Sequence, residues 1–473
     1  MSLKPPNSPL AYPMKKNYLL FFLACSIYFP GLAQLQPVYS FQKDDTILKK
    51  NFYEQSLKKK NTLLASVSKE NAADYKKIYN EQYKEINDLW QSSRPVTSPE
   101  AQSYLQSIVQ KIIAANTELN GTDARIVFTR DWWPNAYSMR DGTIAINAGL
   151  MIFLDNEAEL VYIICHELAH YYLGHMQKTI KKYVETINSD SYKAEIKRLS
   201  KEAYRVNQQL EKFTKSVIFD IRRHSRENEA EADMQAFKFM KKTGYDCGAI
   251  KTGLLLLDKI DDSLIYRPLV LEQMFDFGEY SFKKKWITKE SAIFSQLNEE
   301  DTPLSQKEKD SLKTHPDCIL RVSLLEDSLR IATGGQQFLV DEKEFNQLKK
   351  DFFIEITEEC YKEKKLSRNL YYSLLLLQAG ENIPLAVYSV ARCLNQVYEN
   401  QKNHSVGNLI NTESRTYPEN YNVLLRMLSR LRLDEIATLN YYFCQQYQSQ
   451  MKGYAGFGEE MNKAIKFKNL ITY

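Results

Sequence analysis

The sequence predicts an α+β protein that is mainly α, in which a helical domain with a small β-sheet is followed by an all-α domain of helical hairpins. Segments rich in β-branched and aromatic residues gather between about 124 and 147, and helix-period apolar patterns fill the chain on both sides. After Gly334 and Gly335 the composition is helical to the end. Because 473 residues exceed what one core usually serves, we expect more than one unit.

Four parts are predicted along the chain: a secretory leader at 1–33, an N-terminal helical segment at 34–95, a mixed domain at 96–333 and a helical domain at 334–473. The leader prediction rests on a lysine pair, an apolar run and a cleavage site after Ala33. A rival interpretation makes Cys25 a lipid-modified cysteine. No later segment has the roughly 18 apolar residues of a membrane span. We therefore expect an exported protein, periplasmic or associated with an outer membrane.

Charge and cysteine usage exclude some functions. Lys and Arg number 63 against 59 Asp and Glu, so nothing indicates a nucleic-acid partner. The six cysteines after the leader have no Cys-x-x-Cys spacing, which argues against a cysteine zinc site or a redox dithiol. Export permits disulfides, but the sequence does not give their pairing.

Helices are predicted on the N-terminal side of the β-like segments. Residues 45–93 are polar and free of Pro and Gly, with a loose apolar stripe, so we expect one or two helices packed outside the main core. Ser98 and Pro99 begin the next helix, whose buried stripe starts at Tyr104.

Three strands are predicted next, at 124–129, 135–139 and 143–147. The last two join around Asp141-Gly142, a pair typical of hairpin turns. An exposed edge of this hairpin could hold a peptide as an added strand. An ordinary structural hairpin is equally compatible with these residues.

His166, Glu167 and His170 form a His-Glu-x-x-His motif, the centre of the functional prediction. Two imidazoles four residues apart share one helix face and can bind one metal ion, and the glutamate can reach a water on that ion. The helix begins at Asn156, with Glu159 completing a capping box. The helix is apolar on every face, so it should be buried. Burying the polar residues of the motif costs free energy unless a metal ion binds both imidazoles. Two histidines hydrogen-bonded inside a core are the alternative.

Catalytic zinc sites usually take three protein ligands, so one more is needed. The candidates lie in the segment 225–233. On a helix, Glu229 and Asp233 share a stripe with small and apolar residues, whereas Glu227 and Glu231 lie on the solvated side. Glu229 is therefore predicted as the third ligand, and Asp233 as an acceptor that orients a zinc-bound imidazole.

Two nearby features are not part of this predicted site. His175 follows His170 by five residues and lies off the metal-facing stripe, so it is left out of the ligand set. Residues 176–224 are long, charged and helix-prone, and 183–213 are predicted as a lid or outer helical insertion of unknown function.

These motifs together resemble the M48 family of zinc metallopeptidases. The resemblance is carried by segments 166–170, 225–233 and 314–316 in that order, followed by Arg321, and it covers about 99–327. It is strongest to the exported branch of the family, whose members carry a C-terminal helical domain similar to tetratricopeptide repeats.

The resemblance implies a zincin-like metallopeptidase domain with one Zn2+ per chain. It places the ion on His166, His170 and Glu229, with Glu167 as catalytic base and Asp233 supporting the site. It also implies that His315 approaches the metal, which spacing alone does not show. Two roles for His315 remain open, namely stabilising a developing oxyanion or occupying the open zinc position in a resting form. Arg321 matches the motif without an assigned role.

The C-terminal part is predicted as helices at 370–377, 385–394, 421–431 and 434–451, with Asn382 and Pro384 beginning the second. Degenerate tetratricopeptide-like repeats and a closing helical bundle both fit this pattern. A repeat would offer a groove for a client or an envelope complex.

The sequence therefore predicts an exported zinc metalloendopeptidase of the gluzincin type that acts on protein or peptide substrates, in envelope protein quality control. The alternative is a chaperone-like client-binding protein whose zinc site is structural or autoinhibited. Neither function involves nucleic acid, and neither needs a transmembrane span in the mature chain.

Overall fold

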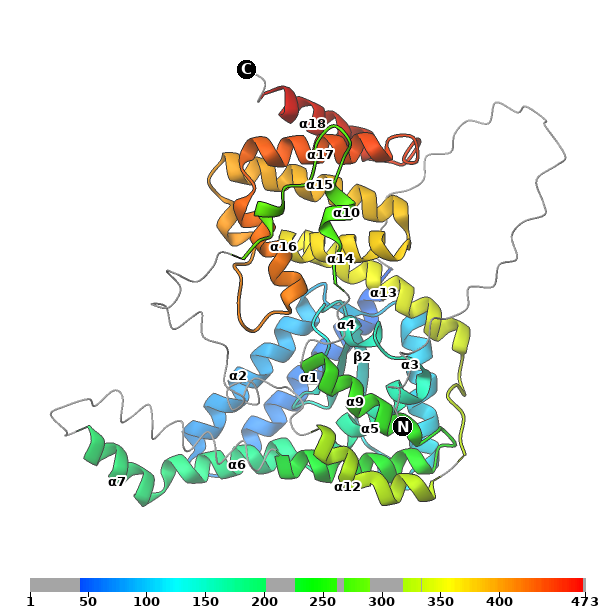
Figure 1. Ribbon diagram of the computed structural model, residues 1–473. Helices are drawn as coiled ribbons and strands as arrows, with labels where there is room; N and C mark the ends of the chain where they lie inside the picture. Colours follow the sequence, from blue (N-terminus) through cyan, green and yellow to red (C-terminus); the bar gives the residue numbers. More distant parts are fainter. Residues whose placement is uncertain (1–42, 201–225, 262–267, 290–317, 333, 471–473) are drawn as a thin grey trace, which may run out of the picture.

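The computed structural model describes five stretches of the chain, residues 43–200, 226–261, 268–289, 318–332 and 334–470 (Figure 1). They are mainly helical and contain one four-stranded sheet, which confirms the predicted fold class. The predicted leader with its cleavage site after Ala33, Cys25 and His315 all lie outside the described residues. None of the described helices is both long and apolar enough to cross a bilayer.

The sheet has the strand order β1-β2-β4-β3. Its strands are β1 (Pro95–Val96), β2 (Arg125–Thr129), β3 (Ala136–Ser138) and β4 (Thr143–Asn147). β2 and β4 are parallel, and the outer strands pair antiparallel to them. β3 and β4 form the predicted hairpin, and Gly142 in its turn has a φ of 86°, a conformation that glycine adopts without a steric penalty. β3 is therefore an edge strand.

The helix with the His-Glu-x-x-His motif, α5 (Glu157–Tyr172), is buried almost throughout, as its apolar surroundings predicted. Asn156 caps it, because its side-chain oxygen accepts a hydrogen bond from the Glu159 N–H at 3.0 Å. The reciprocal bond of a capping box is not formed. The Glu159 carboxylate instead accepts from the Asp155 N–H at 2.7 Å and from the Thr252 hydroxyl at 2.6 Å. Its neighbours in the chain are α3 (Pro99–Ala115) and α4 (Ala148–Met151) before it, and α6 (His175–Asn188) and α7 (Asp190–Leu199) after it.

The N-terminal helices α1 (Thr46–Ser66) and α2 (Ala72–Gln91) pack on each other, outside the main core as predicted. Tyr83, Ile86 and Trp90 of α2 form a small apolar cluster with Val127 of β2. A second cluster joins α2 to α6. Together with α7, α6 forms the described part of the predicted insertion, and both are helical (Figure 1).

The chain ends in a stack of helices that lies beyond the sheet (Figure 1). Its members are α13 (Glu342–Lys362), α14 (Leu366–Ala379), α15 (Ile383–Lys402), α16 (Glu419–Arg430), α17 (Leu433–Tyr447) and α18 (Phe457–Asn469). These include all four predicted C-terminal helices. Asn382 precedes α15 as predicted, although its side chain makes no capping hydrogen bond.

A segment from the middle of the chain packs on this stack. It contains α10 (Leu271–Phe275) and a short 3-10 helix at Lys284–Trp286, and it lies in sequence between α9 (Gly248–Asp261) and α12 (Cys318–Ile331). Tyr280 stacks on Tyr442 of α17 with ring centroids 6.0 Å apart, and Lys283 donates to Glu435 at 2.8 Å. One continuous apolar core therefore connects the sheet-containing part with the helical stack.

Arg368 of α14 makes a polar contact between these two parts. Its guanidinium carbon lies 3.9 Å from the ring centroid of Trp132 and 3.7 Å from that of Tyr421. Stacking on two aromatic faces favours a buried cation. The Tyr372 hydroxyl also donates to the Trp132 carbonyl at 3.2 Å. Because Trp132 lies shortly before β3, the helical stack holds the segment that leads into the edge strand.

Glu157, the first residue of α5, ties the motif helix to the start of the helical stack. Its side chain is fully buried and accepts hydrogen bonds from Tyr104 at 2.8 Å, from Tyr245, and from three successive backbone N–H groups at 339–341. Burial raises the pKa of Glu157, but these hydrogen bonds outweigh burial and hold the pKa below its usual value.

Replacing Glu157 with Gln should lower the free energy of unfolding at pH 7 by about 2–3 kcal/mol, because buried donors lose a charged acceptor. A depressed pKa stabilises the fold above the unfolded-state pKa, so the deficit should shrink as the pH falls below about 4. Urea unfolding at several pH values measures both effects. The exposed Glu326→Gln is the control, expected within about 0.5 kcal/mol of the parent. An equal loss in both variants would contradict the assignment.

Candidate metal centre

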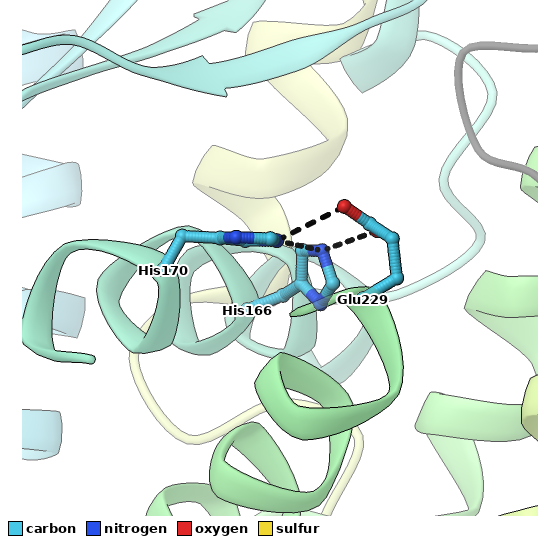
Figure 2. A group of neighbouring side chains, drawn as sticks. All are labelled: His166, His170 and Glu229. Atoms are coloured by element: carbon cyan, nitrogen blue, oxygen red, sulfur yellow. Dashed lines mark hydrogen bonds and ion pairs between the residues drawn. The ribbon is translucent and has the colours of Figure 1, made fainter. Parts of the chain in front are cut away.

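Two histidines of α5 and one glutamate of the helix at 226–241 meet in space (Figure 2). The Nε2 atoms of His166 and His170 lie 3.0 Å apart. His166 Nε2 is 3.3 Å from Glu229 Oε2, and His170 Nε2 is 3.3 Å from Glu229 Oε1. Of the described residues, these three form the group of His, Cys, Asp or Glu side chains whose ligand atoms are close enough to hold one ion.

The spacing of these atoms fits a tetrahedral ion. Ligand atoms bound at about 2.0–2.1 Å around a tetrahedral zinc lie about 3.3 Å from one another. The observed separations are 3.0, 3.3 and 3.3 Å. Two imidazole nitrogens that point at each other at 3.0 Å cannot both carry a proton, whereas both can donate a lone pair to a shared cation. The donor set is therefore suited to Zn2+.

The outer nitrogen of His166 faces a second carboxylate. His166 Nδ1 lies 2.8 Å from Asp233 Oδ1, and Asp233 is only 1% exposed. Burial lowers the pKa of His166, but Asp233 and Glu229 outweigh it and raise the pKa to about 10. An environment that favours a positive charge on this imidazole also favours a metal cation at its other nitrogen. The arrangement of carboxylate, histidine and metal position is the one that orients zinc-bound imidazoles.

Arg321 of α12, to which no role was assigned from the sequence, binds both acidic residues. Its Nε and Nη2 donate to the two oxygens of Asp233 at 2.6 and 2.8 Å, and its Nη1 lies 3.2 Å from Glu229 Oε2. Tyr162 adds a hydrogen bond to Asp233 at 2.8 Å. Burial raises the pKa of both acids. For Glu229, hydrogen bonds with both histidines and the positive charge of Arg321 outweigh burial, and for Asp233, hydrogen bonds with Arg321 and His166 do so, and both pKa values are lowered. The two acids are therefore held as carboxylates.

His170 has its own supporting contact, which the sequence analysis missed. Its Nδ1 lies 2.9 Å from Nδ1 of His175, and His175 Nε2 lies 3.1 Å from Glu231. Glu231 is 52% exposed, so its placement on the solvated side is correct, yet its carboxylate still reaches this chain of contacts. His175 was left out of the ligand set because of its spacing from His170 along a continuous helix. The helix is in fact broken at Gly174, and this break brings His175 next to His170.

The three side chains open into a cleft of about 520 Å³. One wall is the edge strand β3 with the residues that flank it, and the other wall includes the first half of α6. Glu167 lines the same cleft as His166, His170 and Glu229. His315 lies outside the described residues, so its predicted approach to the metal stays a prediction.

A partly helical domain with a His-Glu-x-x-His helix, a glutamate from a second helix and an edge strand beside them defines a zinc-peptidase type of metal centre. Residues 99–329 match the family model described as Peptidase family M48.

The chain is also 23% identical over 183 residues to a protein of Vibrio cholerae serotype O1 named "Putative beta-barrel assembly-enhancing protease". The aligned stretch covers 37% of this chain and 36% of that protein, so the match spans about a third of the relative's length.

Arg321→Lys should weaken zinc binding by roughly 10- to 100-fold, because an ammonium cannot hold both oxygens of Asp233 in one plane. Competition with a chromogenic chelator measures this affinity. Arg330→Lys, at an exposed position of the same helix, should bind zinc like the parent. If Arg321→Lys also binds like the parent, the orientation of Asp233 does not depend on the guanidinium.

Proposed function

We propose that this protein is an exported zinc-dependent endopeptidase that hydrolyses peptide bonds in protein substrates. The observation that carries the proposal is the meeting of His166, His170 and Glu229 at tetrahedral spacing, with Glu167 beside them, in a cleft lined by an edge strand. The M48 match agrees with this chemistry.

Each residue of the centre takes one role in the proposal. His166, His170 and Glu229 would hold Zn2+, which supplies a Lewis acid that polarises the scissile carbonyl and lowers the pKa of water. Glu167 takes the proton of the attacking water and returns it to the leaving amine. Asp233 fixes the ring of His166, and His315 remains a candidate for steadying the oxyanion.

Among the described strands β3 is paired on one side only, so its other edge offers a place for an extended substrate. Asn135, Tyr137 and Met139 hydrogen-bond towards β4, as shown by the contacts between the Asn147 N–H and Asn135 at 2.9 Å and between the Met139 N–H and Thr143 at 2.6 Å. In an antiparallel pair the alternate residues point the other way, so the N–H and C=O groups of Ala136 and Ser138 face outwards. A peptide added antiparallel to β3 would pair with these groups and lie across the centre.

The remaining parts of the proposal concern location and partners. The predicted leader at 1–33 supports export, with cleavage after Ala33 or lipid modification at Cys25 as the two forms to distinguish. The name of the Vibrio cholerae relative supports a role in envelope protein quality control. The domain boundaries at 95–96 and 333–334 and a tetratricopeptide-like client groove in the C-terminal helices belong to the same proposal.

Glu167→Gln should lower kcat by at least about 100-fold, because the proton acceptor is lost, while the zinc content stays at one ion per chain. Glu229→Ala should lose both zinc and activity. Cleavage of a denatured protein substrate, together with metal analysis of each purified variant, checks these expectations. Equal activity in Glu167→Gln and the parent would exclude the mechanism. Substrate binding without cleavage by the zinc-loaded parent would favour the chaperone-like alternative.

N-methylation of a substrate peptide, one residue at a time, should raise KM with a period of two residues. The reason is that only alternate N–H groups of an added strand point towards β3. Initial rates on the methylated series measure the effect, and methylation beyond the ends of the cleft should have none. A flat profile would show that substrates do not bind as an added strand.

A further inference from the structure

The cleft continues past the metal centre to the turn between β3 and β4, where Arg140 lies. Arg140 is the one Lys or Arg among the described residues that line the cleft. Its guanidinium carbon lies 4.3 Å from the ring centroid of Tyr79 on α2, so the N-terminal helical pair supports it from behind. Gln82, one turn further along α2, also lines this end of the cleft.

Among the described residues, the guanidinium at this end of the cleft has a donor without an acceptor. The Nη1 atom of Arg140 is buried and has no hydrogen-bond partner in the part of the chain that the structure describes. The neighbouring acid of the turn is not available to Arg140. The Asp141 carboxylate accepts hydrogen bonds from Arg125, Thr143 and Ser56 instead. A buried guanidinium donor without an acceptor costs free energy that a bound acceptor recovers.

The direction of β3 indicates which part of a bound substrate would lie near Arg140. Ala136 borders the same small cavity as His166 and Glu167, so it marks the place of the scissile bond along the strand. Arg140 follows Ala136 by four residues. A substrate that pairs antiparallel to β3 runs in the opposite direction, so its residues near Arg140 precede the cleaved bond.

We propose that Arg140, with Gln82 beside it, binds a carboxylate side chain of the substrate on the N-terminal side of the cleaved bond, about three to four residues before it. The inference rests on the proposed function and deepens it, because it makes Asp or Glu at this position a specificity determinant. A carboxylate accepts from the Nη1–H of Arg140, and the Tyr79 ring keeps the guanidinium in place.

Three quenched fluorescent peptides of identical sequence except for Glu, Gln or Lys at the third and fourth positions before the cleaved bond test the proposal. The parent should hydrolyse the Glu peptide with a kcat/KM roughly 10-fold above that of the Lys peptide. Arg140→Glu should reverse this order, and Arg140→Gln should abolish the difference, which separates charge recognition from a general loss of fold. The exposed Arg330→Glu should leave the preference unchanged. Raising the salt concentration should reduce the preference of the parent.

Binding of the same peptides to the zinc-loaded Glu167→Gln variant, followed by fluorescence anisotropy, gives a measurement that does not require cleavage. Tighter binding of the Glu peptide, lost in the double variant with Arg140→Gln, supports the proposal. Equal cleavage and equal binding of all three peptides would overturn it while leaving the proposed peptidase function intact. A preference for Gln over Glu would also overturn it, because the site would then recognise an amide. Absence of cleavage together with a charge preference in binding would count against the peptidase function alone.

Discussion

The buried carboxylate of Asp233 is the interaction on which the rest of the centre depends. It receives hydrogen bonds from Tyr162 of α5 and Arg321 of α12 and contacts His166, so three helices that are distant in sequence meet on one group. A buried ion pair contributes little to stability compared with an apolar replacement, but removing one partner leaves an uncompensated charge at a large cost. The contacts of Asp233 are therefore costly to break, and they also fix the orientation of the His166 ring.

The formal charges of the centre also favour a dication. Glu167, Glu229 and Asp233 bring three negative charges into a largely buried space, and Arg321 brings one positive charge. The remaining two negative charges match the charge of Zn2+, and burial is expensive for ions that are not paired. Asp233 and Glu229 also favour a proton on His166, which is the physical reason that the pKa of His166 is raised. Zinc and this proton therefore compete for the same imidazole.

The features that follow from helical periodicity were predictable from the sequence. The contacts that depend on how distant helices are oriented in the tertiary structure were not. The spacing of His166 and His170 and the helical stripe of Glu229 and Asp233 depend only on 3.6 residues per turn, so both were predictable. The contacts of Arg321 and His175 were not, because they depend on how α12 and the break at Gly174 place side chains. Residues 271–288 pack on the C-terminal helices, which are distant in sequence, so no local sequence pattern could predict this contact.

The β3 side of the cleft is held from two sides by parts of the chain outside the M48 match at 99–329. Tyr79 of α2 lies against Arg140 at the start of the β3–β4 turn, and Arg368 of α14 stacks on Trp132 shortly before β3 begins. An edge strand paired on one side only would otherwise be free to twist or shift relative to the metal centre. In the proposed reaction the scissile bond must be positioned within a fraction of an ångström, so the two flanking helical regions would contribute to it through the strand that they hold. A movement of the helical stack would therefore shift β3 through the contact between Arg368 and Trp132, without any contact to the metal ligands.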